Sequence, residues 1–118
     1  MIRPQEGSTL TREFVMTPSF DRSWSAIGLD DRDLAELQDT LLLDPESGDL
    51  IPGTGGARKM RVAAKDHGKR GGARVIYVDV VVLEEIYLLA VYAKNVQIDM
   101  TPDEKKIVRD FIRQLKEE

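Results

Sequence analysis

Hydrophobic residues recur along this chain with spacings that predict helices and strands in succession. Residues 13–17, EFVMT, form a short β-prone run. Phe20, Trp24 and Ile27 then recur at i, i+4 and i+7, the spacing of one helical face, just after a Thr-Pro pair suited to begin a helix. A second stripe, of leucines, predicts a helix from about residue 30 to the Asp-Pro pair at 44–45, where proline stops it.

The second half of the chain has the pattern of strands followed by one helix. Three runs have strand character, namely 58–63 (RKMRVA), 73–82 (ARVIYVDVVV) and 86–94 (IYLLAVYAK). The last two are nearly continuous in apolar residues, which is typical of central strands covered on both faces. A Thr-Pro-Asp-Glu capping box at 101–104 begins the final helix. The predicted apolar face of that helix consists of Ile107, Val108, Phe111, Ile112 and Leu115.

These elements occur in the order β-α-α-β-β-β-α, with no internal repeat and no linker. The economical interpretation is a single α+β domain over residues 13–118, preceded by a flexible leader at residues 1–12. We expect a central antiparallel sheet built from the three later strands, with the C-terminal helix packed on it through Phe111 and Leu115. A length of 118 residues suffices for one hydrophobic core.

Composition narrows the function classes. The chain has no cysteine and only one histidine, which excludes disulfides and thiolate chemistry and argues against a zinc site. No apolar run approaches the roughly 20 residues that cross a bilayer, and the polar first residues lack the apolar core of a signal peptide. We therefore expect a cytoplasmic protein with no membrane partner, no metal site and no cofactor.

Positive charge is concentrated in one glycine-rich segment. Between Gly53 and Arg74, seven lysines and arginines stand against the single acid Asp66, a net charge of +6. The whole chain carries −4, so the remainder carries −10. A local basic patch on an acidic body predicts a polyanionic ligand at one site.

The glycines of this segment have two interpretations. A nucleotide-binding P-loop requires Gly-x-x-x-x-Gly-Lys-Ser/Thr between a strand and a helix, whereas GTGGARKM at 53–60 lacks that ending and leads into a strand. The glycines either permit tight turns at positive φ or let the backbone approach a phosphodiester, and the two roles are compatible.

Four cations are candidates for a phosphate site. Lys59 and Arg61 are two residues apart, so they share one face of a strand, from which Arg58 points away. Arg74 begins the next strand and Lys94 ends the one after it. Strand pairing would gather these four cations on one face of the sheet, where they are costly to hold together without an anion. The alternative is a solvated charged face, which is usual for scattered lysines.

Two further residues carry candidate chemistry. His67 lies in a loop-like context and has a side chain suited to general acid–base chemistry near neutral pH, although a solvated loop histidine is the commoner case. Tyr92 lies two residues before Lys94, and an aromatic ring beside a cation at a strand end can stack on a base. Core packing is the competing interpretation for Tyr92.

Three stretches give the chain a family resemblance: GDLIPGTGGARKMRVAAKDHGKRGGARVIYV (48–78), YLLAVYAKN (87–95) and MTPDEKK (100–106). From about residue 13 to residue 116, the chain resembles the RelE/ParE superfamily of type II toxins, and within it the HigB-type, RelE-like mRNA interferases. The resemblance implies a microbial RNase-type α+β fold with an N-terminal strand, a helical hairpin, an antiparallel sheet and a C-terminal helix.

The resemblance also implies an activity and partners. Such toxins cleave mRNA in the ribosomal A site without a metal ion, using the 2′-OH of the substrate as nucleophile, and so stop translation. A cognate antitoxin of the helix-turn-helix DNA-binding type is expected to neutralise the toxin, and operator DNA would be bound only through that antitoxin. The alternative on the same fold is a non-enzymatic toxin or binding module, similar to the ParE inhibitors of DNA gyrase.

Residue by residue, the resemblance implies a catalytic set, and residue type and position add an RNA-binding set. Arg74 would stabilise charge on the phosphate, for which a planar guanidinium is well suited. The catalytic set is Lys59, Arg61, Lys69, Arg74 and Lys94. The RNA-binding set is Lys65, His67, Arg70 and Tyr92.

The chain departs from the family pattern in two respects. RelE toxins are typically basic, whereas this chain carries −4, so ribosome binding would depend on the basic segment. Asn95 follows Lys94 where some relatives carry a second arginine. The assignment of the general acid and the general base therefore stays open.

Overall fold

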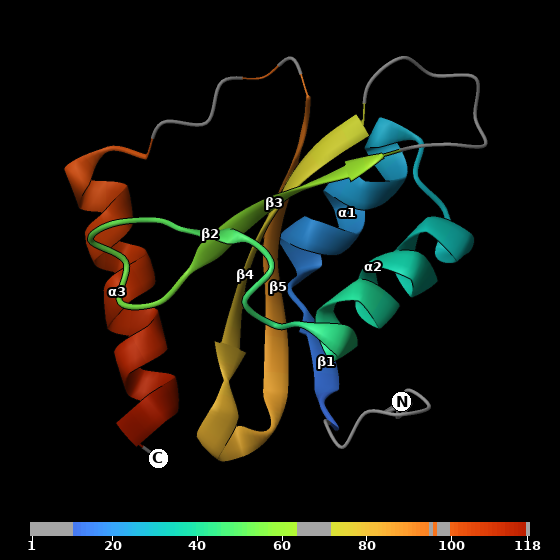
Figure 1. The fold of residues 1–118 in the computed structure, drawn as a ribbon. Helices are drawn as coiled ribbons and strands as arrows, with labels where there is room; N and C mark the ends of the chain where they lie inside the picture. The colour runs from blue at the N-terminus through green and yellow to red at the C-terminus, as the bar shows by residue number, and fades with distance from the viewer. Residues whose placement is uncertain (1–10, 64–71, 95, 97–99, 118) are drawn as a thin grey trace.

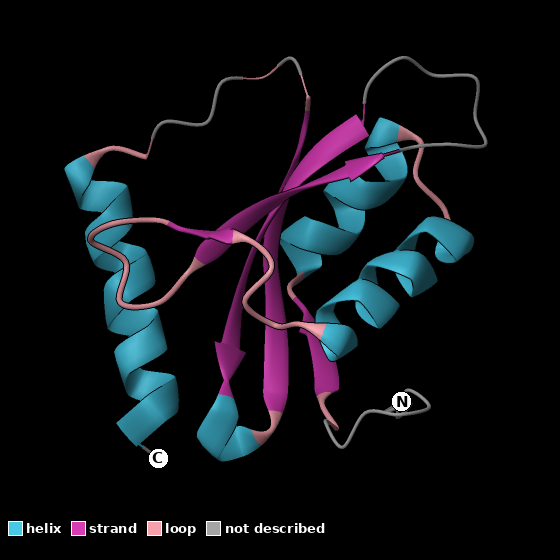
Figure 2. Ribbon diagram, in the orientation of Figure 1, coloured by secondary structure: helices cyan, strands magenta, loops and turns pink. Residues whose placement is uncertain are grey.

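A central sheet separates two helices on one face from a third helix on the other (Figure 1). The structure is a computed structural model that describes residues 11–63, 72–94, 96 and 100–117. The elements are β1 (Glu13–Met16), α1 (Pro18–Ile27), α2 (Asp31–Leu43), β2 (Asp49–Leu50), β3 (Arg58–Ala63), β4 (Gly72–Val80), the 3-10 turn η2 (Val81–Leu83), β5 (Glu85–Ala93) and α3 (Pro102–Glu117). The five strands lie in the order β1-β5-β4-β3-β2, with the three long strands at the centre (Figure 2).

The predicted α+β fold, the order of elements and the antiparallel pairing of the three later strands are confirmed, and two features at the edges of the sheet differ from the prediction. β1 runs parallel to β5, so the sheet is mixed rather than antiparallel throughout. The two-residue β2, which the sequence pattern did not predict, adds a strand at the opposite edge. It pairs with the beginning of β3, with Asp49 opposite Lys59 and Leu50 opposite Arg58.

β4 is shorter than its β-prone sequence predicts. The strand ends at Val80, and Val81 and Val82 enter the turn η2, where each residue is 63% exposed. Glu84 closes this turn at φ 55°, a left-handed conformation that is uncommon for a residue other than glycine. The turn overrides the strand propensity of its valines because the chain must reverse there to pair β5 with β4.

Polar caps explain where the helices begin. The Thr17 hydroxyl accepts a backbone N–H at the start of α1, at 3.1 Å. At α2, Asp30 and Asp33 each accept the other's backbone N–H at 3.0 Å. The predicted capping box of α3 is confirmed, since Thr101 and Glu104 make the same reciprocal pair of hydrogen bonds. These caps satisfy N–H groups that have no partner within their helices.

Alternation along the central strands divides the core in two. Val75 and Tyr77 of β4 point to the side of α1 and α2 and pack with Phe20 and Trp24. The alternate residues of β4 point to the other side, which we call the α3 face. There the buried cluster is Ala57, Ile76, Val78, Val80 and Ile112.

α3 packs on the sheet with a narrower stripe than its sequence predicts. Ile112 is its fully buried residue, and Leu115 packs beside it as predicted. Phe111 is only at the border of the contact, 37% exposed, with its ring edge-on to Tyr87 at 5.9 Å between centroids. Ile107 is 69% exposed and takes no part in the buried face. The correction arises because five apolar residues span more of the helix surface than the sheet covers.

The chain is anchored before its first strand. Arg12 is buried, and its guanidinium makes a two-pronged ion pair with Asp79 of β4, at 2.6 and 3.2 Å. The expected leader, residues 1–12, therefore ends in a residue that is tied to the sheet. Residues 1–10 lie outside the described residues.

Candidate functional site

Strand register places three of the predicted site residues in one row. Arg61 of β3 lies directly opposite Arg74 of β4, and Arg74 lies directly opposite Tyr92 of β5. Directly opposed residues project from the same face, with Cβ atoms about 4.5–5.5 Å apart. Lys59 lies opposite Ile76, and therefore also projects from the α3 face. We call the part of this face formed by Lys59, Arg61, Arg74 and Tyr92 the cationic end.

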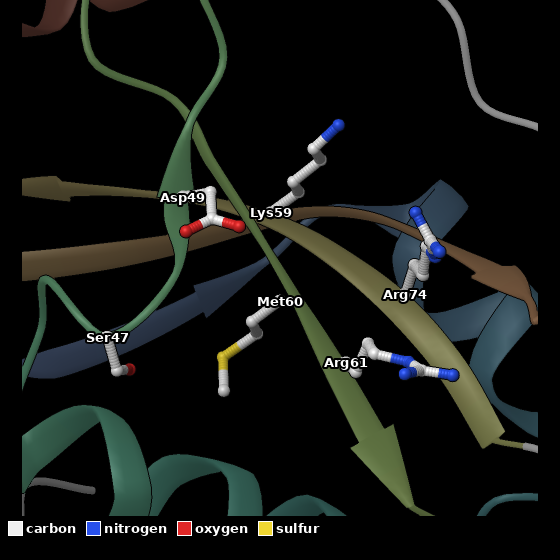
Figure 3. A pocket seen from close by; sticks show the side chains of 6 residues that line it. All are labelled: Ser47, Asp49, Lys59, Met60, Arg61 and Arg74. Carbon is white, nitrogen blue, oxygen red and sulfur yellow. The ribbon is translucent and has the colours of Figure 1, made fainter.

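A pocket of about 360 Å³ opens at the cationic end (Figure 3). Its lining residues are Ser47, Asp49, Lys59, Met60, Arg61 and Arg74. The Met60 side chain points toward Ser47, away from the amino group of Lys59, so the pocket wraps around the outer edge of β3. Because β2 pairs only with the first two residues of β3, this edge faces no further strand in the described part of the chain.

Arg74 is the cation held under the greatest constraint. Its Nε is buried and has no hydrogen-bond partner among the described residues. Leaving a buried donor unpaired costs about 1–3 kcal/mol. The directly opposed Arg61 adds a like charge, which is also unfavourable across a strand pair. An anion that accepts hydrogen bonds from the guanidinium would both pair the buried Nε and reduce the repulsion between the two arginines.

The close approach of β3 and β4 beside Arg74 depends on a glycine. A Cβ atom added at Gly72 would overlap the carbonyl oxygen of Val62 on the neighbouring strand. Any side chain at this position would therefore push the two strands apart just where Arg61 and Arg74 are paired. The glycine at position 72 thus has a local geometric reason.

The wall of the pocket at residues 45–49 is held by two side chains from the sheet. The Tyr77 hydroxyl accepts the Gly48 N–H at 2.9 Å and donates to the Pro45 carbonyl at 2.7 Å. The Arg58 guanidinium donates to the Gly48 carbonyl at 2.8 Å. Burial, the first cause, raises the pKa of Tyr77 above the ordinary 10.0, so the hydroxyl remains the neutral donor that this arrangement needs.

The glycine loop at 52–57 contacts helix α3 rather than the pocket. Gly53, Gly55 and Gly56 have φ angles of 84°, 77° and 130°, which favour glycine. The Gly53 carbonyl accepts a hydrogen bond from Arg109 of α3 at 2.8 Å. None of these loop residues lines the pocket. The turn interpretation of these glycines is therefore the one that the described contacts support.

The structure brings together part of the predicted site. Lys59, Arg61 and Arg74 line the pocket, and Tyr92, 37% exposed, lies beside Arg74. Lys94 follows β5 at the same end of the sheet, where its backbone N–H donates to Gly72 at 3.0 Å, but it does not line the pocket. The remaining predicted residues, Lys65, His67, Lys69 and Arg70, lie outside the described residues.

Sequence reasoning missed the other half of the pocket. Asp49 was not a candidate, because a two-residue strand leaves no periodic signal in a sequence. Ser47 and Met60 were not candidates either, because neither side chain carries a charge that would attract an anion. The pairing of Asp49 with Lys59 is a property of sheet register alone. Tyr77 lies in the core, and its hydroxyl also positions this wall.

The described residues contain neither a metal-binding cluster nor a membrane-spanning helix. Within it, no group of three or more histidine, cysteine, aspartate or glutamate side chains is arranged to hold a metal ion. None of the helices in these residues is both long enough and apolar enough to cross a membrane.

Fold and site together define a small α+β protein with a cation-lined pocket at one end of its sheet. A family model described as the RelE toxin of the RelE/RelB toxin–antitoxin system matches residues 15–117. Because that match covers most of the chain, the protein belongs to the RelE toxin family.

Two solved structures are similar to this chain at low identity. A mutant of the Escherichia coli toxin RelE in the free state is 15% identical with a TM-score of 0.49, over 68% of this chain and 80% of that one. A chain of the archaeal RelE–RelB complex from Pyrococcus horikoshii OT3 is 21% identical with a TM-score of 0.47, over 73% of this chain and 98% of that one. Roles of individual residues do not transfer over such distances.

Proposed function

We propose that this protein is the toxin of a type II toxin–antitoxin system and acts as a ribosome-dependent mRNA endoribonuclease. The observation that carries the proposal is the row of Arg61, Arg74 and Tyr92, next to Lys59, at the open end of the sheet. Two opposed guanidinium groups and an amine around one pocket suit a phosphodiester. Membership of the RelE toxin family supports the toxin assignment.

The proposed reaction needs no metal ion. The 2′-oxygen of the substrate attacks the neighbouring phosphorus while a base removes the 2′-OH proton. The bond from phosphorus to the 5′-oxygen breaks, and an acid protonates that oxygen, which leaves a 2′,3′-cyclic phosphate and a 5′-OH. Arg74 and Arg61 stabilise the charge that develops on the phosphoryl oxygens, since preorganised donors are most effective where charge develops.

The remaining roles are assigned by residue type and place. Proton transfer falls to the amines at this end of the sheet, Lys59 and Lys94, together with Lys69. Tyr92 offers an exposed aromatic ring on which a base can stack. Lys65, His67 and Arg70 lie in the sequence between β3 and β4. We retain them as RNA-binding residues of the proposal.

The proposal includes partners. A cognate antitoxin is expected to neutralise the toxin by covering the cationic end or by blocking entry to the ribosomal A site, and operator DNA would be bound only through the antitoxin. The matching family is named for a toxin–antitoxin system, which supports such a partner. Outside the basic segment the chain carries a net charge of −10. The basic segment is therefore the obvious docking place for an acidic segment of the antitoxin. Action on translating ribosomes places the protein in the cytoplasm.

The test is cleavage of a defined mRNA in a purified translation system, mapped by primer extension with and without ribosomes. We expect new 5′ ends within A-site codons only when ribosomes translate the message, and none with Arg74→Ala protein. Intact messages combined with inhibition of DNA supercoiling by gyrase would instead establish the ParE-like alternative. Cleavage of naked mRNA at the same rate would contradict ribosome dependence.

A further inference from the structure

The pocket has two ends of opposite character. Arg61 and Arg74 lie toward one end, and Ser47 and Asp49 lie toward the other (Figure 3). A carboxylate repels a phosphate, so Asp49 has no use in binding the anion itself. Asp49 lies opposite Lys59 in the sheet, but no ion pair joins its carboxylate to any of the three cations that line the pocket. Its place in the pocket calls for another explanation.

The carboxylate-bearing wall is fixed in position. Gly48, next to Asp49, is buried and is bonded on both sides, its N–H to Tyr77 and its carbonyl to Arg58. A Cβ atom at Gly48 would come within 2.8 Å of the Lys59 carbonyl, so the wall is packed closely against β3. Asp49 itself pairs with Lys59 in the sheet. A wall held in this way presents Asp49 at a defined distance from the cations, as a recognition site requires.

A nucleotide matches both ends of this pocket. Its phosphate suits the guanidinium groups, and its base can present hydrogen-bond donors to a carboxylate and a hydroxyl. The thioether of Met60, which lines the pocket on the side of Ser47, offers an apolar surface for the face of a base. The volume of about 360 Å³ lies within the range of small-molecule sites.

We propose that Asp49 determines base specificity by accepting a hydrogen bond from an exocyclic amino group. The inference rests on the proposed function, and it concerns the nucleotide that supplies the 2′-OH. Cytosine and adenine carry such an amino group on their pairing edges, and guanine has one too. Uracil has no exocyclic amino group, and its one donor on that edge, the ring N3–H, is flanked by two carbonyl oxygens that a carboxylate repels. Asp49 therefore favours cytosine, adenine and guanine over uracil at this position.

The first experiment measures cleavage of four messages that differ only in the nucleotide 5′ to the cleaved bond. We expect wild-type protein to cut after cytidine, adenosine or guanosine about tenfold faster than after uridine, a modest value for one base contact. Asp49→Ala should bring this ratio close to one. Asp49→Asn should raise cleavage after uridine, because an amide can donate to its carbonyl.

Glu46→Ala is the matched control, since Glu46 is an exposed carboxylate of the same segment that does not line the pocket. It should keep the wild-type rate and ratio. An Asp49→Ala protein that is folded and still discriminates against uridine as the wild type does would overturn the proposal. So would a wild-type protein with no preference among the four messages.

The second experiment separates this inference from the proposed activity. Amide and methyl NMR signals of Ser47, Asp49 and Met60 are followed while 3′-CMP or 3′-UMP is added to the full chain. We expect 3′-CMP to shift these signals at concentrations about tenfold lower than 3′-UMP, with the difference lost in Asp49→Ala. If no message is cleaved but this difference is present, the base site stands and the proposed activity falls. If neither nucleotide shifts these signals, the base site is wrong whatever the activity.

Discussion

The two ends of the α3 face are carried by the same strands and differ in what they do for the protein. At one end, Ile76, Val78 and Val80 are buried under α3 and stabilise the fold. At the other, which α3 leaves open, Arg61 and Arg74 face each other across a strand pair. The first arrangement favours folding and the second opposes it. The position of the candidate site is therefore set by where the covering helix stops.

This difference indicates how the fold can hold an unfavourable arrangement of charge. Each strand is anchored at its apolar end, and the same rigid strand extends into the cationic end. Arg74 is only two residues from Ile76, whose side chain is 1% exposed. The backbone of Arg74 is consequently fixed without any stabilising contact from its own Nε. Sites for charged ligands commonly oppose stability in this way and are supported by structure elsewhere.

The largest expected effect comes from Arg74→Ala at the cationic end. Loss of one preorganised charge from the transition state should lower the rate of mRNA cleavage by about 100- to 1,000-fold. The free energy of unfolding should stay the same or rise, because the unpaired Nε is removed. Primer extension gives the rate and denaturant titration the stability.

Arg74→Lys sharpens this first prediction. Lysine keeps the charge but not the two parallel donors of a guanidinium, so cleavage should recover only in part. Full activity of a folded Arg74→Ala protein would show that the cationic end is not the site of cleavage.

Ile112→Ala tests the apolar end. Ile112 is 1% exposed, and removal of a buried isoleucine side chain should lower the free energy of unfolding by about 2–5 kcal/mol. Cleavage per folded molecule should change little, because the pocket is not lined by α3. Ile107→Ala, on the exposed side of the same helix, is the control and should stay within about 0.5 kcal/mol of wild type. Equal losses from the two variants would mean that α3 does not pack as described.

Tyr77 lies in the core and its hydroxyl holds the pocket wall, so Tyr77→Phe should have an effect of intermediate size. It leaves the buried Gly48 N–H without its acceptor, which should lower the free energy of unfolding by about 1–3 kcal/mol near neutral pH. It should also loosen the wall that carries Asp49. Denaturant titration measures the first effect, and the Asp49 amide signal reports the second.

The stability difference between wild type and Tyr77→Phe should also depend on pH in a definite direction. Burial raises the pKa of folded Tyr77 above 10.0, so its contribution to stability is complete below that value and is lost as pH rises through the folded pKa. The wild-type protein should therefore lose its advantage over Tyr77→Phe as pH rises above 10.0. An advantage that is constant or grows with alkaline pH would be inconsistent with a buried neutral hydroxyl.

Local patterns in the sequence were sufficient for most of the fold. The apolar spacing of α1 and α2 and the capping box of α3 act within a few residues, and β3 and β5 were predicted almost to their ends. The parallel direction of β1, the short β2 and the turn at Val81 and Val82 were not predicted. These three depend on contacts between distant segments, which local propensity does not describe.

The features of the candidate site likewise divide into those set by local pattern and those set by contacts between distant segments. The shared face of Lys59 and Arg61 follows from strand alternation, and it was predicted. Their alignment with Arg74 and Tyr92 depends on register, which no local pattern specifies. Asp49 was missed altogether, because only the pairing of β2 with β3 brings it to the pocket.

The smallest expected effect concerns the repulsion between the two arginines. Arg61 is exposed and directly opposes Arg74, and like charges in that position destabilise a strand pair by less than about 1 kcal/mol. Arg61→Gln should therefore raise the free energy of unfolding by a few tenths of a kcal/mol at low salt. The gain should shrink as added salt screens the wild-type repulsion. Arg22→Gln, an exposed arginine of α1, is the control and should show no such gain. Denaturant titrations at low and high ionic strength measure both variants. A loss of stability in Arg61→Gln that is independent of salt would mean that Arg61 stabilises the cationic end, and the contrast between the two ends of the sheet would then fail.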